Sequence, residues 1–239
     1  MKVKSMIRRG IIKSLQLVGY DFDKISLEGA LQRCRARGMQ IGTVIDVGAS
    51  NGMWTEKCVK FFPDAAYFLV EAQSPHEPYL RRLKQKMPKL DYVMAAAGDT
   101  VGEIYFDASH LLGGLASYEP FAENNITVPV TTIDALVEQH HLQPPFLIKL
   151  DTHGFEVPIL AGAQATLAQT GLLVIEVYNF EVAKGSLLFH EMCAYLEPLG
   201  FGCVDMCDPL HRPRDGALWQ FDLFFGRTDS DVWQSPSYE

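Results

Sequence analysis

The chain has little of what marks a membrane-spanning, nucleic-acid-binding or fibrous protein. Its 239 residues contain no apolar run near the roughly 18 residues of a membrane helix, no internal repeat and no low-complexity segment. Positive charge is scarce, because 21 Lys and Arg residues face 29 Asp and Glu residues and leave a net charge of −8. We therefore expect no nucleic-acid partner, since an acidic chain lacks the field that attracts one.

Cysteine is also sparse and irregularly spaced. The count of five is odd, and only one pair lies close together in sequence, so neither a disulfide framework nor a zinc site is predicted. This usage is typical of reduced thiols in a cytoplasmic protein. The cysteines are Cys34, Cys58, Cys193, Cys203 and Cys207.

The chain does have the length and composition for one hydrophobic core. Hydrophobic residues make up 48% and charged residues 21%, as in ordinary globular proteins. We predict an N-terminal helical extension over residues 1–40 and one domain over residues 41–239. Basic residues from Lys2 to Lys13 alternate with isoleucines at helical spacing, so we expect this helix to pack on the domain edge. Contact of its basic face with a membrane surface is the alternative.

Short apolar strands alternate with amphipathic helices along most of the sequence. This alternation predicts an α/β fold with a mostly parallel sheet covered on both faces. The last two strands are separated only by a loop, which predicts an antiparallel pair. The predicted strands span residues 43–47, 66–72, 91–99, 146–150, 171–178, 201–207 and 218–226, with shorter ones at 102–106 and 128–134. The predicted helices span residues 54–62, 77–87, 134–140 and 189–199, with another from residue 155.

A glycine-containing loop, "DVGASNG", ends the first strand at residues 46–52. Ligands of open parallel sheets bind beyond the carboxyl ends of the strands, so the loop is a candidate binding site. A dinucleotide fingerprint needs G-x-G-x-x-G, but Ser50 and Met53 replace the last two glycines, which argues against NAD. We predict that the loop contacts the ligand through Asp46, Gly48, Ser50, Asn51 and Gly52.

Acidic residues follow the next two strands as well. Glu71 ends the second strand, where a carboxylate can accept both hydroxyls of a ribose. NAD and S-adenosylmethionine both carry that ribose, but only the latter has a cationic amino acid group for Asp46. Gly98 and Asp99 end the third strand, where an adenine edge would lie. Asp99 accepts from the adenine amino group or is a turn residue, and the sequence leaves both open.

Residues 43–178 resemble the FkbM family of S-adenosylmethionine-dependent methyltransferases. The resemblance rests on "IDVGASNG", "FLVEA", "AAAGDTVGEIYF", "VTTIDALV" and above all "FLIKLDTHGFEVPILAGA" followed by "GLLVIEVY". It implies a seven-stranded class I (Rossmann-like) methyltransferase domain over residues 41–239. It also implies S-adenosylmethionine as donor, S-adenosylhomocysteine as product and O-methylation, often of sugar or natural-product hydroxyls. Many members have Val-Glu or Thr-Gln where this chain has Thr152-His153, so no family role carries over to position 153.

The methyl acceptor would lie at the end of the strand over residues 146–150. For methyl transfer, the acceptor hydroxyl must be aligned with the methyl carbon and must be deprotonated. We predict His153 as general base and Asp151 as its orienting partner or as a contact of the donor's amino group. A lysine in a buried strand needs a partner for its charge. Lys149 therefore pairs with Asp151 or Glu156, or it contacts the substrate oxygen. For Glu156, capping of the next helix is favoured over direct chemistry.

The fifth strand ends in "IEVYNF", at the same edge of the sheet. Its polar residues Glu176, Tyr178 and Asn179 are predicted, with Glu156, to bind the substrate. No metal is favoured. The weaker alternative is a divalent cation held across a diol acceptor by Asp151, His153 and Glu176.

The sequence therefore favours an O-methyltransferase for a small-molecule hydroxyl, with a carbohydrate as the preferred acceptor. A polyketide or other natural-product hydroxyl is the first alternative. A non-catalytic module that binds S-adenosylmethionine is the second, and a nicotinamide oxidoreductase is the least favoured. The sequence leaves the oligomeric state open.

Overall fold

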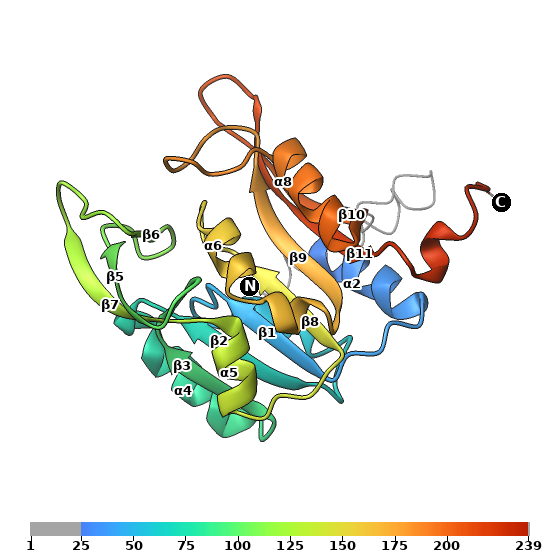
Figure 1. Cartoon of the computed structure of the whole chain (residues 1–239), viewed down its shortest axis with the longest axis horizontal. Coiled ribbons are helices and arrows are strands. Elements are labelled where there is room, and N and C mark those ends of the chain that lie inside the picture. The colour runs from blue at the N-terminus through green and yellow to red at the C-terminus, as the bar shows by residue number, and fades with distance from the viewer. Residues whose placement is uncertain (1–24, 239) are drawn as a thin grey trace, which may run out of the picture.

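The structure, a computed structural model, describes residues 25–238 and is built around one seven-stranded sheet (Figure 1). The strand order is β10-β11-β9-β8-β1-β2-β3, and only β11 runs antiparallel to its neighbours. The predicted mostly parallel sheet with an antiparallel C-terminal strand is confirmed. The strands are β1 (Thr43–Val47), β2 (Ala66–Glu71), β3 (Leu90–Met94), β8 (Phe146–Leu150), β9 (Thr170–Tyr178), β10 (Phe201–His211) and β11 (Leu218–Arg227).

Helices cover both faces of the sheet, which explains why the central strands are buried at every position and mostly apolar. All five residues of β1 and of β8 are buried, as expected for strands enclosed on both sides. One core packs α2 (Leu27–Ala36), α3 (Met53–Cys58) and α4 (Glu77–Lys86) on the sheet. The other core packs α5 (Ile133–Gln139), α6 (Glu156–Ala161), α7 (Gln164–Leu167) and α8 (Phe189–Leu196) on the opposite face.

A second, smaller sheet lies between β3 and α5 in the chain, and the sequence did not predict it as a separate sheet. Its strands are β4 (Ala96–Ala97), β5 (Gly102–Asp107), β6 (Leu115–Ser117) and β7 (Asn125–Thr131), in the order β4-β7-β5-β6. The single strand predicted over residues 91–99 is wrong. β3 ends at Met94, and β4 leaves the main sheet to pair with β7.

The described part of the predicted N-terminal extension packs into the core. α2 begins after Ser26, whose side chain accepts a hydrogen bond from the Gly29 N–H, and it buries Leu27 and Leu31. On its outer side the Arg33 guanidinium donates to both carboxylate oxygens of Asp205 on β10, at 2.7 and 2.8 Å. The basic segment before residue 25, with its possible membrane contact, lies outside the described residues, and the division at residue 40 stays a prediction.

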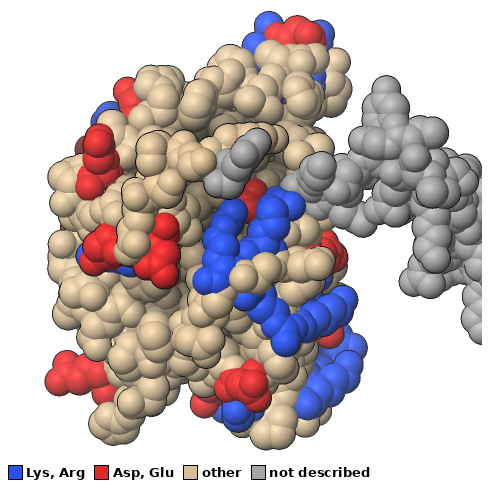
Figure 2. Space-filling model, turned by 90° about the vertical axis from the view of Figure 1, so that its right-hand side faces the viewer, with Lys and Arg blue, Asp and Glu red and all other residues tan. Residues whose placement is uncertain are grey.

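Surface charge is unevenly distributed. Figure 2 shows Lys and Arg side chains gathered on one face, although the whole chain carries a net charge of −8. The absence of a nucleic-acid partner therefore stays a prediction, because net charge does not describe that face. No helix among residues 25–238 is long and apolar enough to cross a bilayer.

Candidate functional site

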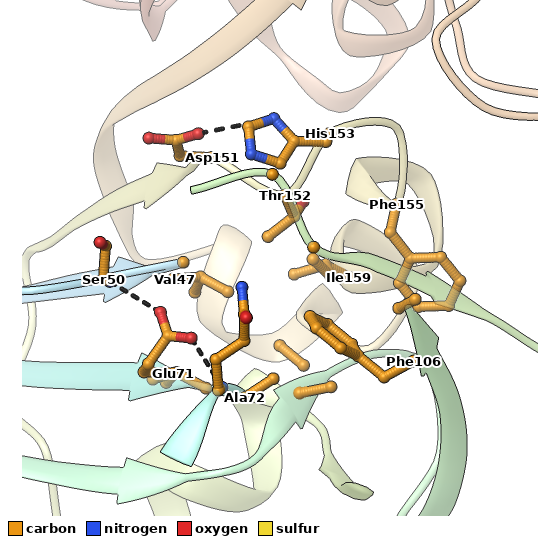
Figure 3. A pocket seen from close by; sticks show the side chains of 18 of the residues that line it. Val47, Ser50, Glu71, Ala72, Phe106, Asp151, Thr152, His153, Phe155 and Ile159 are labelled. Carbon is orange, nitrogen blue, oxygen red and sulfur yellow. Dashed lines mark hydrogen bonds and ion pairs between the residues drawn. The ribbon is translucent and has the colours of Figure 1, made fainter. Parts of the chain in front are cut away.

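The carboxyl ends of β1, β2, β8 and β9 surround a cavity that the second sheet closes from one side (Figure 3). Its volume is about 330 Å³, within the range of small-molecule sites. Six of the predicted site residues line it: Gly48, Ser50, Glu71, Asp151, His153 and Glu176. The cavity therefore brings together the ends of four strands, as the sequence predicted.

Glu71 presents a fixed carboxylate to this cavity from the end of β2. It is only 6% exposed, and its two oxygens accept the N–H groups of Ser50 and Gln73, each at 2.7 Å. A carboxylate oxygen can accept more than one hydrogen bond, so both keep acceptor capacity. A buried carboxylate with two adjacent acceptor oxygens suits the vicinal hydroxyls of a ribose.

The wall next to Glu71 is apolar. It is formed by the small side chains of Ala95, Ala96 and Ala97 together with Phe106 and Ile159. A flat aromatic base can lie against such a surface while its sugar reaches a polar group at one end. The wall and Glu71 together fit the adenosine part of S-adenosylmethionine.

The first glycine of the loop after β1 is needed for main-chain packing. Gly48 has φ +73°, and a Cβ atom there would lie 2.0 Å from the carbonyl oxygen of Asp151. Only glycine accepts this conformation without strain and allows this approach. Gly48 therefore lets the loop after β1 touch the end of β8, so that donor and acceptor sides of the cavity meet.

Beneath the cavity floor, Lys149 lies between two carboxylates. Its Nζ atom is 3.2 Å from Asp46 Oδ1 and 3.1 Å from Asp151 Oδ2, and it donates to the Gly48 carbonyl oxygen at 3.1 Å. Burial lowers the pKa of Lys149, but the charges of Asp151 and Asp46 outweigh burial, so its pKa is raised. Of the partners that the sequence left open, Asp151 is the one Lys149 contacts, and Asp46 is a second partner that was not predicted. Lys149 is a buried cation that holds two strand ends together.

Asp46 lies elsewhere than the sequence suggested. It is fully buried, accepts a hydrogen bond from the Thr55 hydroxyl at 2.7 Å, and does not line the cavity. The expected contact with a cationic amino acid group is absent from this arrangement because Lys149 occupies that position. Asp151, at the end of the neighbouring strand β8, does line the cavity and is a carboxylate available to such a group.

His153 contacts protein groups through both ring nitrogens. Its Nδ1 lies 2.7 Å from the Tyr178 hydroxyl and 3.1 Å from Glu176 Oε2, while its Nε2 lies 3.2 Å from the Leu112 carbonyl oxygen. Burial lowers the pKa of His153, but the hydrogen bond to Glu176 and the charges of Glu176 and Asp151 leave it raised. A general base needs a free nitrogen, so Nε2 can accept a proton only after the Leu112 carbonyl has moved.

Negative charge exceeds positive charge around His153. Besides Asp151 and Glu176, Asp222 stands opposite Glu176 in the pairing of β9 with β11. Burial and the charges of Glu176 and Asp151 raise the pKa of Asp222 to about 7. Lys149 is the nearby cation, and it is shared with Asp46. The acceptor side of the cavity is therefore suited to a cation or to hydroxyl groups.

The remaining predicted residues lie away from the cavity wall. Glu156 is buried and accepts from the Gly154 N–H and the Thr152 hydroxyl, each at 3.0 Å, so it holds the turn before α6; no side chain of the described residues caps that helix. Asp99 is exposed and accepts from the Tyr118 hydroxyl at 2.7 Å. The others are Asn51, Gly52, Gly98 and Asn179, and Asn179 lines a separate shallow cavity.

Two glutamines line the cavity without having been predicted. Gln220 on β11 donates to Glu176, and Gln73 donates to the carbonyl oxygens of His110 and Leu111 at 3.3 and 3.2 Å. His76 makes a further contact of 2.8 Å to the Leu111 oxygen. Gln73 stands two residues after Glu71, which is the one signal that the sequence offers for it. The segment from Ala108 to Gly114, here called the cover loop, is thus attached to the cavity by two side chains that follow β2, Gln73 and His76.

The sequence matches the model of the Methyltransferase FkbM domain over residues 46–203, well over half of the chain. No protein with a curated description matches it. Solved structures similar to this fold include a putative O-methyltransferase from Klebsiella pneumoniae, with 13% identity, a TM-score of 0.49 and coverage of 92% of this chain and 89% of that one. A 1,6-didemethyltoxoflavin-N1-methyltransferase from Burkholderia thailandensis has 14% identity, a TM-score of 0.48 and coverage of 95% and 90%. A putative tRNA methyltransferase from Streptococcus pneumoniae has 13% identity, a TM-score of 0.48 and coverage of 83% and 72%.

Proposed function

Because this chain belongs to the FkbM family of S-adenosylmethionine-dependent methyltransferases, we propose that its methyl acceptor is a hydroxyl group of a small molecule, with a sugar or glycoconjugate favoured. The observation that carries the proposal is the polar wall opposite Glu71. Asp151, His153, Glu176 and Gln220 all line the cavity, and mutual contacts join them into one polar group. Hydrogen-bonding groups that converge in this way suit a molecule with several hydroxyls. An apolar substrate would leave these groups without hydrogen-bond partners.

In this mechanism each side of the cavity has a separate task. Bound S-adenosylmethionine supplies a methyl group on a cationic sulfur, which needs no further activation. Glu71 holds the ribose, and the alanine wall beside it holds the base. Asp151, His153 and Glu176 would orient the acceptor hydroxyl toward the methyl carbon, and its proton would pass to solvent as the carbon–oxygen bond forms and the carbon–sulfur bond breaks. Correct alignment is the main contribution that the protein makes to such a displacement.

The donor half of the proposal is tested by calorimetric titration with S-adenosylhomocysteine. We expect binding by the unaltered chain and at least tenfold weaker binding by Glu71→Ala, because the ribose loses its acceptor. Glu103→Ala is the matched control, since Glu103 is an exposed carboxylate at the start of β5. Binding of NAD, or equal binding by both variants, would contradict the assignment of this cavity to the donor.

The acceptor half is tested with isotope-labelled S-adenosylmethionine and separate panels of sugars and nucleotide sugars, polyketide alcohols, amines and RNA. We expect label in an ether methyl group of a carbohydrate, identified by mass spectrometry. Transfer to a polyketide hydroxyl would keep O-methylation and change the substrate class. Transfer only to nitrogen or to RNA would overturn the proposal. Donor binding without transfer to any panel would favour a non-catalytic binding module.

A further inference from the structure

Three side-chain atoms with lone pairs converge at the acceptor side of the cavity. They are Asp151 Oδ1, His153 Nδ1 and Glu176 Oε2, supplied by the ends of the adjacent strands β8 and β9. His153 Nδ1 lies 3.1 Å from the Glu176 oxygen and 4.0 Å from the Asp151 oxygen, and all three ligand atoms lie within 4.8 Å of one another. An ion with bonds of about 2.1–2.2 Å places neighbouring ligand atoms about 3 Å apart and opposite ones just over 4 Å apart.

The second oxygen of each carboxylate is already bound by another side chain. Lys149 lies 3.1 Å from Asp151 Oδ2, and Gln220 donates to Glu176 Oε1. The oxygens that face His153 are thus the ones left for a further ligand, although the Tyr178 hydroxyl also donates to Glu176 Oε2. Outer partners of this kind, which orient the ligating carboxylates, are usual around protein-bound metal ions.

The histidine is oriented in the same way. The Leu112 carbonyl oxygen, 3.2 Å from Nε2, can only accept a hydrogen bond, so Nε2 must carry the hydrogen. In the neutral ring, Nδ1 then holds the lone pair, on the side of the ring where the Tyr178 hydroxyl, Glu176 and Asp151 lie at 2.7, 3.1 and 4.0 Å. A metal-ligating histidine almost always donates its other N–H to a carbonyl or carboxylate, and the contact to Leu112 meets that condition.

We propose that Asp151, His153 and Glu176 bind a divalent cation, and that this ion holds the acceptor in the reaction assigned above. Its remaining coordination positions open into the cavity, because all three ligands line it. Two carboxylates and one imidazole suit Mn²⁺, Mg²⁺ or a similar ion. The role of the ion in catalysis rests on the proposed function, whereas the binding of the ion does not.

The ion would bind two neighbouring hydroxyls of the acceptor and make one of them more acidic. The proton of that hydroxyl passes to solvent. The oxygen then forms a bond to the methyl carbon as the carbon–sulfur bond breaks, and the sulfur keeps the electron pair of that bond. His153 acts as a ligand through Nδ1, which agrees with the engagement of Nε2 by Leu112.

The proposal is tested by Mn²⁺ binding to the full chain, followed by electron paramagnetic resonance of the free ion. Each sample is also titrated calorimetrically with S-adenosylhomocysteine, which reports on folding and on the donor side. We expect one tight Mn²⁺ site per chain, with at least tenfold weaker binding in His153→Ala and in Glu176→Gln. S-adenosylhomocysteine binding should stay within about twofold, because neither side chain contacts the donor in our assignment.

A second group of possible ligands supplies the matched control. Cys207, Asp208 and Asp222 also lie close together, but none of them lines the cavity. Asp208→Asn removes an exposed carboxylate from that group and should leave Mn²⁺ binding unchanged. Loss of the ion in Asp208→Asn, with retention in both cavity variants, would place the ion elsewhere and overturn the proposal.

The two halves of the assignment fail separately. A chain that binds S-adenosylhomocysteine but no Mn²⁺, with or without that ligand present, overturns the cation site and leaves the methyltransferase assignment intact. A chain that binds Mn²⁺ at these three residues but no S-adenosylhomocysteine supports the cation site and overturns the donor site. Equal Mn²⁺ binding by the unaltered chain and by both cavity variants also overturns the cation site.

Discussion

Lys149 shows how much one side chain can contribute when its charge is buried between two carboxylates. It is only 4% exposed and contacts Asp46 from β1 and Asp151 from the end of β8. Breaking a buried ion pair costs far more than breaking an exposed one, because the remaining charge stays buried without a partner. Lys149 therefore matters for the integrity of the cavity floor rather than for contact with the substrate.

We predict that Lys149→Met lowers the free energy of unfolding by about 3–5 kcal/mol, because two carboxylates lose their shared cation. The measurement is urea denaturation followed by circular dichroism. Lys84→Met is the control, since Lys84 pairs with Asp91 where both side chains are nearly half exposed. Its effect should stay below about 1 kcal/mol. Similar losses in the two variants would show that Lys149 is not a buried structural cation.

At this scale the sequence predicted which residues gather but not what each one contacts. The need of a strand lysine for a partner follows from burial alone, but the sequence left Asp151, Glu156 and a substrate oxygen open as that partner. The position of Asp46 could not, because it depends on Lys149, which is more than 100 residues away in the chain. The tautomer of His153 depends on the Leu112 carbonyl, and no spacing rule relates those two positions.

At the scale of elements, the loop after β1 and the end of β8 form one contact. Gly48 permits that contact, since its φ is +73° and its Cα faces the Asp151 carbonyl oxygen. Both loops lie on the cavity, so any displacement of one changes the position of the other.

We predict that Gly48→Ala weakens S-adenosylhomocysteine binding at least tenfold and lowers the melting temperature. A left-handed conformation costs a residue with a Cβ about 1–2 kcal/mol, and the approach to Asp151 adds a clash. Gly171→Ala is the matched control, because nothing lies within 4 Å of its added Cβ and its φ is ordinary. Unaltered binding by Gly48→Ala, measured calorimetrically, would contradict the contact.

The cover loop is a second element whose attachment can be measured. Gln73 donates to the carbonyl oxygens of His110 and Leu111, so Gln73→Ala removes two contacts between the turn after β2 and the loop. We predict faster hydrogen exchange over residues 108–114 in this variant, with the central strands unchanged. Gln40→Ala is the control, since that amide contacts only the nearby Gly38 carbonyl oxygen. If exchange in the loop did not change, Gln73 would not be what holds it.

The main elements were predictable because the central strands are enclosed by helices and are mostly apolar, with one charged residue each in β1 and β8. β1 and β8 have the predicted bounds, and the antiparallel pair of β10 and β11 has the predicted direction. The second sheet was not predictable, because β4 is two alanines that pair with β7 more than 30 residues later. Alanine carries little strand signal, and long-range pairing leaves no local pattern.

For the whole molecule, the donor site joins loops from several strands, so an occupied site should stabilise the entire fold. A ligand at 100 times its dissociation constant stabilises the folded state by about 2.7 kcal/mol. In a chain of this length that corresponds to a rise of about 5–10 °C in melting temperature. We predict this shift with S-adenosylhomocysteine, measured by differential scanning fluorimetry, and little shift with NAD. A comparable shift in Glu71→Ala would indicate that the ligand binds at another place.

The second sheet is a single continuous stretch of chain whose two ends lie side by side, because Ala96 and Ala97 pair with Val130 and Thr131. It contributes Ala96, Ala97 and Phe106 of the apolar wall, together with the cover loop, to the cavity, whereas Glu71 and the glycine loop belong to the main sheet. Such a stretch can change in length while its two junctions stay in place, so insertions and deletions among relatives of this chain should gather in it. They would reshape the wall and cover of the cavity and leave the strands of the main sheet where they are.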